Sequence, residues 1–149
     1  MPIFIGTDHR GFELKNKLLE YLQEKNIRVE DLGNYQYDAQ DDYPDFAGKV
    51  AQAVLQSQTE SVGIVICGSG VGVSIAANRF QRIRCALGFN ESQVKHAREN
   101  DHANMLAIPC DYITFEQATK IIDAFLNSQP IQNEKYLRRV EKLDSITIE

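Results

Sequence analysis

The chain has 149 residues, of which 43% are hydrophobic and 25% are charged, and these values are typical of one globular domain. They exclude a disordered chain, a collagen and a coiled coil. The formal net charge is −5, which argues against binding to nucleic acid or to an anionic membrane. We find no apolar run of the roughly 18 residues that a membrane helix needs, and no signal-peptide pattern at the N-terminus.

Short apolar runs alternate with amphipathic runs of helical length along the chain. The apolar runs predict five strands, at Ile3–Thr7, Ile27–Leu32, Val62–Cys67, Ile83–Gly88 and Met105–Ile108. The run at 62–67 is apolar on both faces, as a central parallel strand must be when helices cover both sides of the sheet.

Helices are predicted between and after these strands. Asp45, Asn90 and Thr114 are candidate N-caps, and Gln117 completes a capping box with Thr114. A last helix, at about 134–146, looks peripheral, and we expect it to pack on a partner subunit. The alternation predicts an α/β fold over a single domain, residues 1–149, with a doubly wound, five-stranded parallel sheet and helices on both faces.

Ligands of such sheets bind at the carboxyl ends of the strands. We therefore expect a site formed by the segment 7–9, the segment 67–70 and the polar segment before Met105. The central part, Cys67-Gly68-Ser69-Gly70-Val71-Gly72, has three glycines that allow backbone N–H groups to approach an anion. It lacks the dinucleotide and P-loop patterns, so it suits an oxyanion or a polyhydroxy ligand, or is a tight turn without a ligand.

The three cysteines are odd in number and form no CxxC pair, so we expect reduced thiols in a cytoplasmic protein. Cys67 ends a buried strand before a helix N-terminus, where a thiolate could act as a nucleophile or a general base. The alternative is a buried, inert thiol. Cys85 and Cys110 fit that alternative better, because neither precedes a glycine-rich turn.

Three further polar groups each have a plain structural alternative. Asp8 and His9 could orient hydroxyl groups or assist proton transfer, although Asp8 is also a good N-cap. The segment 100–104 is either part of a site or a solvated loop. The basic residues of the last helix, Lys135, Arg138 and Arg139, either bind a phosphate or only solvate the helix.

Taken together, these segments resemble one family, the B-type ribose-5-phosphate isomerases, whose wider group includes the galactose-6-phosphate isomerase subunits. The resemblance covers nearly the whole chain in order, and its longest motif runs from residue 67 to 78. The matching segments are Asp8-His9-x-Gly11, Asp42-Tyr43-Pro44, Cys67-Gly68-Ser69-Gly70-Val71-Gly72-Val73-Ser74-Ile75-Ala76-Ala77-Asn78, Ala103-Asn104 and Arg139-Val140-Glu141.

The resemblance implies a Rossmann-like homodimer, or a tetramer, that interconverts ribose 5-phosphate and ribulose 5-phosphate without a metal or an organic cofactor. Cys67 would be the base that moves the proton, and Ser69 would polarise the carbonyl group. The backbone N–H groups of Gly70, Val71 and Gly72 would hold the enediolate oxygens, and Gly68 would be a further substrate contact. The residues implied to contact the sugar or its phosphate are Asp8, His9, Tyr43 and, from the partner's last helix, Lys135 and Arg139.

The chain departs from the family pattern at three places. Where many members carry a His-Asn pair that opens the furanose ring, it has Asn100-Asp101, with His102 close by. We take Asn100 and His102 as candidates for ring opening and Asp101 as a candidate substrate contact. Asp111 and Lys135 stand where many members have arginine. Two alternatives therefore remain, an isomerase of another sugar phosphate such as a hexose 6-phosphate, and a catalytically weak sugar-phosphate binding protein.

Overall fold

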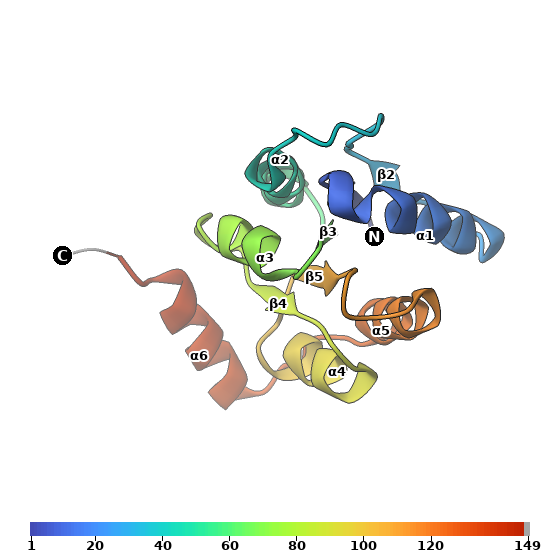
Figure 1. The fold of residues 1–149 in the computed structure, drawn as a ribbon. Coiled ribbons are helices and arrows are strands. Elements are labelled where there is room, and N and C mark those ends of the chain that lie inside the picture. The colour runs from blue at the N-terminus through green and yellow to red at the C-terminus, as the bar shows by residue number, and fades with distance from the viewer. Residues whose placement is uncertain (148–149) are drawn as a thin grey trace.

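The computed structural model describes residues 1–147 and shows a parallel sheet between two layers of helices (Figure 1). The strands are β1 (Ile3–Thr7), β2 (Glu30–Asp31), β3 (Val62–Cys67), β4 (Cys85–Leu87) and β5 (Met105–Pro109). Their order across the sheet is β2-β1-β3-β5-β4, so β3 is central. The predicted doubly wound α/β fold is confirmed. Within the described residues, none of the helices has the length and apolar character needed to span a membrane.

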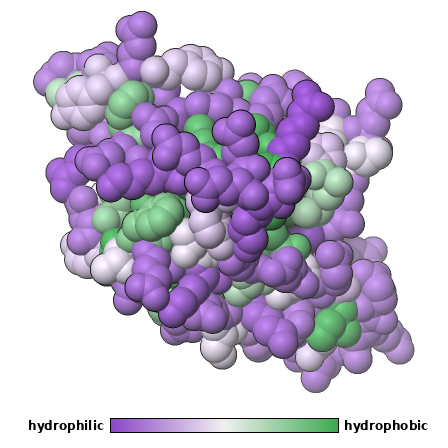
Figure 2. Space-filling view, turned by 90° about the vertical axis from the view of Figure 1, so that its right-hand side faces the viewer, coloured by the Kyte–Doolittle hydropathy of each residue, from purple (hydrophilic) through white to green (hydrophobic). Residues whose placement is uncertain are grey.

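The helices divide between the two faces of the sheet. A short 3-10 turn, η1 (His9–Gly11), leads into α1 (Phe12–Glu24), and the chain continues through α2 (Tyr43–Gln56), α3 (Val71–Ala77), α4 (Glu91–Asn100), α5 (Phe115–Asn127) and α6 (Glu134–Asp144). Helices α1, α4 and α5 pack on one face, whereas α2 and α3 pack on the other. Seen from the right-hand side of Figure 1, the surface is largely hydrophilic, with small separate hydrophobic areas (Figure 2).

Alternation along β3 divides its side chains between the two cores. Ile64 and Ile66 join the cluster under α1, α4 and α5, whereas Val65 and Cys67 join the cluster under α2 and α3. All six residues of β3 are buried, which explains why the run is apolar throughout. The Cys67 side chain therefore lies on the α2/α3 face.

Local signals set most helix starts. The Asn90 side chain accepts from the Gln93 N–H at 2.8 Å, and the predicted capping box of Thr114 is present in both directions. The predicted cap at Asp45 is wrong. Helix α2 starts at Tyr43, because Pro44 has the fixed φ angle that suits a first helical turn. The two edge strands, β2 and β4, are shorter than predicted.

Helix α6 stands apart from the sheet (Figure 1). It has no buried residue, and its Leu137 and Leu143 are 43% and 49% exposed. Its C-terminal end is tied to the body by an ion pair of 2.9 Å between Arg84 Nη1 and Asp144 Oδ1. The amphipathic helix thus presents apolar side chains that its own chain does not cover.

Candidate active site

The carboxyl ends of three neighbouring strands form one edge of the sheet. Thr7 of β1 is in register with Ile66, and Cys67 is in register with Pro109 of β5. The segments that follow these strands therefore lie side by side, in agreement with the rule for ligand sites in open parallel sheets. The backbone N–H of Cys110 donates to the Cys67 carbonyl at 3.0 Å, which joins two of the segments directly.

The glycine-rich loop turns directly above Cys67, which is 5% exposed. Gly70 has φ 72°, the left-handed conformation in which α3 begins, and a side chain there would also clash with Leu87. The first N–H groups of a helix have no partner within it. One of them, from Val71, donates to Ser69 Oγ at 3.2 Å. The loop thus collects a hydroxyl group and several backbone donors next to the thiol.

Tyr43 reaches the same loop from the start of α2. A side-chain carbon built on Gly72 would come within 2.9 Å of the Tyr43 ring, so the ring lies directly against that glycine. The structure therefore brings together nine of the predicted site residues at this edge: Asp8, His9, Tyr43, Cys67, Gly68, Ser69, Gly70, Val71 and Gly72.

Asp41 fixes the imidazole of His9. Its Oδ1 atom accepts from the His9 backbone N–H at 3.0 Å and lies 2.7 Å from His9 Nδ1. Its other oxygen accepts from the Asn34 side chain at 3.0 Å. Burial alone would raise the pKa of Asp41, but the hydrogen bonds from Asn34 and His9 and the charge of His9 outweigh it and lower that pKa. The carboxylate therefore stays charged and orients His9.

The pKa of Asp8 is shifted in the opposite direction to that of Asp41. Burial raises the pKa of its carboxyl group above the ordinary value, although the backbone N–H of Arg10 donates to it at 3.0 Å. Asp8, His9 and Asp41 also have ligand atoms within 4.8 Å of one another, which is a geometry that could hold a metal ion. Because their oxygen and nitrogen atoms already bond to one another and to the backbone, the group suits the orientation of sugar hydroxyls equally well.

The other two cysteines differ from Cys67 in their surroundings. Burial raises the pKa of the Cys85 thiol to about 12. Burial, helped by the nearby carboxylates of Asp111 and Asp8, raises the pKa of Cys110 to about 12. Both thiols are protonated at neutral pH, so neither can serve as a base there.

The segment before Met105 does not lie at this edge, and the prediction that it does is wrong. The Asn104 carbonyl accepts from the N–H of Gly63, at the start of β3, so the segment lies at the amino ends of the strands. The reason is chain order: residues that precede a parallel strand are at its amino end. Asn100 and His102 are therefore separated from Cys67 of the same chain by the length of the sheet.

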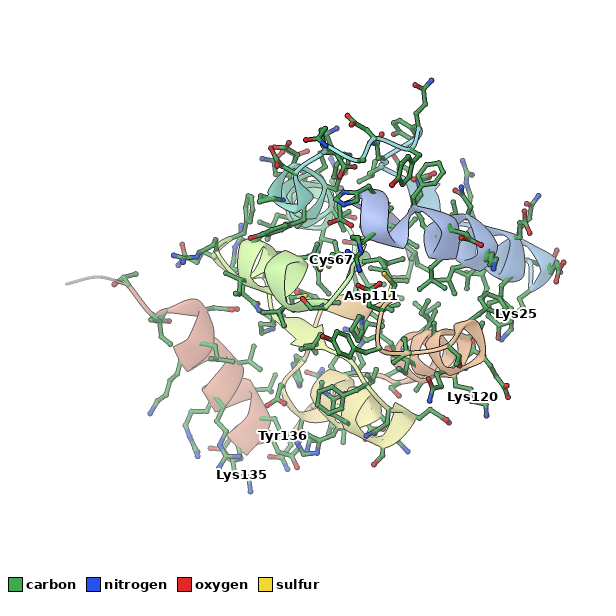
Figure 3. The ribbon with its side chains drawn as sticks, viewed as in Figure 1. Lys25, Cys67, Asp111, Lys120, Lys135 and Tyr136 are labelled. Atoms are coloured by element: carbon green, nitrogen blue, oxygen red, sulfur yellow. The ribbon has the colours of Figure 1, made fainter. Side chains whose placement is uncertain are left out.

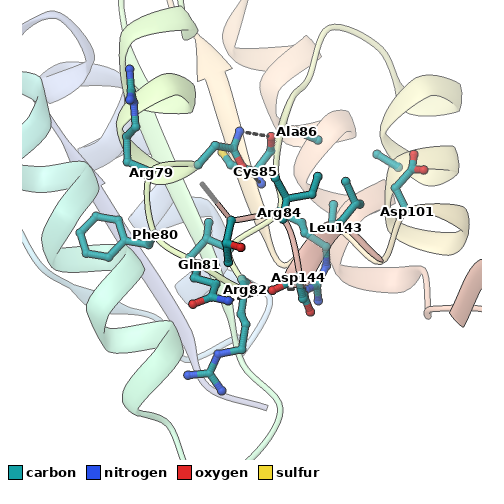
Figure 4. A pocket seen from close by; sticks show the side chains of 16 residues that line it. Arg79, Phe80, Gln81, Arg82, Arg84, Cys85, Ala86, Asp101, Leu143 and Asp144 are labelled. Atoms are coloured by element: carbon teal, nitrogen blue, oxygen red, sulfur yellow. Dashed lines mark hydrogen bonds and ion pairs between the residues drawn. The ribbon is translucent and has the colours of Figure 1, made fainter. Parts of the chain in front are cut away.

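His102 is held in the interior at that far edge. It is 8% exposed, has φ 51°, and its Nε2 lies 2.9 Å from the carbonyl oxygen of Ile131, to which it can only donate. Asp101 lies on a cavity of about 610 Å³ between the β4 region and α6 (Figure 4). Neither residue contacts the glycine-rich loop of its own chain.

The two predicted phosphate ligands on α6 also lie away from Cys67. Lys135 and Arg139 are exposed and lie one turn apart on the same helix. Figure 3 shows Lys135 at the lower, N-terminal end of α6, whereas Cys67 and Asp111 lie close together at the sheet. The structure thus divides the predicted site into two groups of residues that do not meet within one chain.

Three residues near these groups were missed by the sequence reasoning. Arg10, the unspecified position of the Asp8-His9-x-Gly11 motif, forms an ion pair with Asp111. Asp41 lies in a polar segment before Pro44, where no motif or spacing distinguishes it from its acidic neighbours. His96 contacts the Asn100 side chain, with 3.0 Å between Asn100 Nδ2 and His96 Nδ1. The helical spacing of four residues from Asn100 is the signal that could have pointed to His96.

Comparisons with known proteins agree with this architecture. The family model of ribose/galactose isomerases matches residues 3–143. A probable ribose-5-phosphate isomerase B of Mycoplasma genitalium is 40% identical over 95% of this chain and 92% of its own. A crystal structure of a ribose 5-phosphate isomerase from Thermotoga maritima has a TM-score of 0.91 and 42% identity, and covers 97% of this chain and 98% of that one.

A second solved structure adds a ligand. The crystal structure of ribose-5-phosphate isomerase B from Mycoplasma genitalium with bound ribulose 5-phosphate has a TM-score of 0.90 and 40% identity, and covers 96% of this chain and 93% of that one. Because both the family model and these relatives match almost the full length, the chain belongs to the ribose/galactose isomerase family.

Proposed function

We propose that this chain is an aldose–ketose isomerase that interconverts ribose 5-phosphate and ribulose 5-phosphate. The observation that carries the proposal is the position of Cys67, at the carboxyl end of β3 and beside Ser69 and the backbone donors of the glycine-rich loop. Relatives of similar length that carry this activity in their names, one of them solved with ribulose 5-phosphate, support it.

Proton transfer between two adjacent carbons accounts for the reaction. Thiolate Sγ of Cys67 takes the proton from carbon 2 of the aldose, a carbon–carbon double bond forms between carbons 1 and 2, and the carbonyl oxygen becomes an oxyanion. Backbone N–H groups of Gly70, Val71 and Gly72 stabilise that charge. Ser69 helps the proton of the carbon 2 hydroxyl move to oxygen 1, and the thiol returns its proton to carbon 1, which leaves the ketone at carbon 2.

The remaining residues of this edge bind the sugar. His9, oriented by Asp41, and Asp8 supply donors and acceptors for hydroxyl groups, and Tyr43 closes one side of the loop. No step requires a metal or an organic cofactor.

We also propose that two copies of the domain pair, with α6 packing on the partner. This helix has an uncovered apolar side and two cations one turn apart. In such a homodimer, Lys135 and Arg139 of the partner subunit bind the substrate phosphate. The segment 100–102 belongs to the same group of residues and takes part in ring opening, with Asp101 as a substrate contact.

A second substrate class, the hexose 6-phosphates, is favoured by one observation. A cavity of about 430 Å³ opens beside Ser69 and Val71 and is lined on its far side by Phe89 and Tyr112. That space lies next to the loop that would hold the reacting carbons, so a longer sugar phosphate could extend into it.

The deciding experiment is a panel of pentose and hexose phosphates incubated in deuterated water. An isomerase incorporates solvent deuterium at carbon 1 or 2 and forms the paired ketose or aldose. Ribose 5-phosphate should give the highest kcat/KM. Preference for a hexose 6-phosphate would correct the substrate, and binding of these compounds without any exchange would reject isomerisation in favour of a sugar-phosphate binding protein.

A further inference from the structure

An ion pair lies directly over the residue that follows Cys67. Arg10, in the η1 turn after β1, reaches across the edge of the sheet and pairs through its Nη2 with Oδ2 of Asp111, in the turn after β5. A side-chain carbon built on Gly68 would lie 2.7 Å from that carboxylate oxygen and 3.5 Å from Arg10 Nε. The guanidinium group is therefore part of the predicted active-site edge.

Hydrogen bonds join the turn after β5 to the glycine-rich loop and to the η1 turn beneath this ion pair. The N–H of Asp111 donates to the Gly68 carbonyl at 2.9 Å, and Cys110 Sγ lies 3.2 Å from the carbonyl oxygen of Arg10. The turns that carry Arg10 and Asp111 are thus both bonded to their neighbours at this edge. These backbone contacts fix the positions of the two turns, so that the side chains of Arg10 and Asp111 meet above Gly68.

Most donors of this guanidinium are free for a ligand. Arginine has five N–H donors, and only Nη2 of Arg10 has a hydrogen-bond partner among residues 1–147. The side chain is 56% exposed, so the remaining donors face solvent at the mouth of the site. The cations of α6 do not reach this edge within the chain, whereas Arg10 Nε lies against Gly68, the residue that follows Cys67.

Asp111 by itself would repel a phosphate at this place. Its pairing with Arg10 compensates that charge and holds the guanidinium beside Gly68, with the remaining donors directed to the mouth of the site. Arginine binds phosphate through paired, charge-assisted hydrogen bonds, and this chain has a net charge of −5, so any anion must be attracted by such a local group.

We infer that Arg10 binds the phosphate group of the substrate and that Asp111 is the positioning residue that holds its guanidinium at the mouth of the site. The inference rests on the proposed function for the identity of the substrate. The anion site itself does not depend on turnover, because inorganic phosphate can probe it.

The test measures binding of inorganic phosphate by calorimetry at fixed ionic strength, and KM and kcat for ribose 5-phosphate. Arg10→Gln should weaken phosphate binding and raise KM by roughly ten- to a hundredfold, because it removes a charge-assisted hydrogen bond, while kcat changes less. Arg10→Lys should recover only part of the affinity, because an ammonium group lacks the bidentate fork.

The matched control is Lys120→Gln on α5 (Figure 3). Lys120 is equally exposed, at 56%, and is paired with Glu116, so its loss changes the net charge by the same amount. It should leave phosphate binding within twofold of the parent. Adding Asp111→Asn to Arg10→Gln should recover part of the lost affinity, because it removes a carboxylate that has lost its partner.

Two results would overturn the inference. One is an Arg10→Gln protein that binds inorganic phosphate as well as the Lys120→Gln control does. The other is a parent protein that binds no phosphate at millimolar concentrations. An inactive parent whose phosphate binding still depends on Arg10 would reject the isomerase activity and keep the anion site, so the two failures are distinguishable.

Discussion

Cys67 and His102 lie at opposite edges of the same sheet. Cys67 is in register with Pro109 at the carboxyl ends of β3 and β5, whereas His102 precedes the amino end of β5. Four residue steps of strand separate the two edges, which is about 13 Å at the usual rise. Residues from both groups can therefore act on one substrate only if they come from two copies of the chain.

Mixing experiments should reveal such a shared site. We expect Cys67→Ala and Arg139→Ala to be weakly active alone, and their mixture, after subunit exchange, to regain about a quarter of the parental activity. Half of the dimers are then mixed, and each mixed dimer has one intact site of two. The measurement is kcat/KM per subunit, at substrate concentrations below the parental KM, in equimolar mixtures whose exchange is verified by mass.

The control mixture combines Cys67→Ala with Ser69→Ala. Both substitutions lie in the same half of the site, so no intact site forms in any dimer and no activity should return. Recovery in this control, or no recovery in verified mixed dimers of Cys67→Ala and Arg139→Ala, would contradict a site built across two subunits.

Removal of the Cys67 thiol should abolish proton transfer without unfolding the protein. Loss of a general base lowers the rate by on the order of a hundredfold or more. We therefore expect Cys67→Ala to lose at least this factor in deuterium exchange at carbon 2 and in kcat. Cys85→Ala is the control, since the pKa of that thiol is raised to about 12 and it cannot act as a base at neutral pH. Near-parental exchange by Cys67→Ala would reject the assignment.

The two cations of α6 should differ in their contribution to phosphate binding. Arg139 can form two parallel hydrogen bonds to a phosphate, whereas Lys135 acts as a point charge. Arg139→Ala should therefore raise KM more than Lys135→Ala, by roughly tenfold or above for one charge-assisted contact. Competitive inhibition by inorganic phosphate should be weakened more by Arg139→Ala than by Lys135→Ala. Equal inhibition of the parent and of Arg139→Ala would show that α6 is only a solvated surface.

His102 should matter for stability, whatever its part in ring opening. Its Nε2 donates to the Ile131 carbonyl in the linker before α6, and its φ is 51°. His102→Asn keeps a residue that tolerates this backbone conformation but shortens the side chain, and the loss of this partly buried hydrogen bond costs about 1 kcal/mol. We expect a lower Tm and faster hydrogen exchange in the linker.

The same variant tests ring opening. In a pre-steady-state burst on ribose 5-phosphate, the small open-chain fraction reacts before the cyclic fraction. A slower second phase, measured at a temperature where the variant is fully folded, would support ring opening by His102. An unchanged ratio of the two phases would leave the residue a structural role only, and His96→Ala would then test the imidazole that contacts Asn100.

The sequence predicts the bounds of the central strands better than those of the outermost strands, β2 and β4. Strands β1 and β3 have the predicted bounds, because a strand buried on both faces is apolar along its whole length. The edge strands β2 and β4 are shorter, since pairing on one side only lets the ladder end early. The capping box at Thr114 was visible because it depends on two residues at a fixed spacing.

The site was harder to predict than the fold. Cys67 and its loop are a continuous motif, and the structure places them as one unit. The relation of Asn104 to Gly63 depends on strand direction and order, which spacing alone does not reveal. Arg10 was missed because its partner, Asp111, is 101 residues away, and only the folded sheet brings the two together.

Asp8 gives a pH dependence of stability with a definite sign. Burial raises the pKa of its carboxyl group in the folded protein above the ordinary 3.8, so the folded state binds that proton more tightly than the unfolded state does. Asp8 therefore opposes folding at pH values above its folded pKa, and this cost disappears as the pH falls below 3.8.

Asp8→Asn should unfold at higher urea concentration than the parent at pH 7, and the difference should vanish toward pH 3.5. Asp38→Asn, in an exposed turn, is the control and should show no such trend. A constant difference across this range would mean that Asp8 acts on stability through its hydrogen bond to the Arg10 N–H alone. Activity is a separate readout: if Asp8 also contacts the sugar, Asp8→Asn should gain stability at pH 7 and lose kcat/KM together.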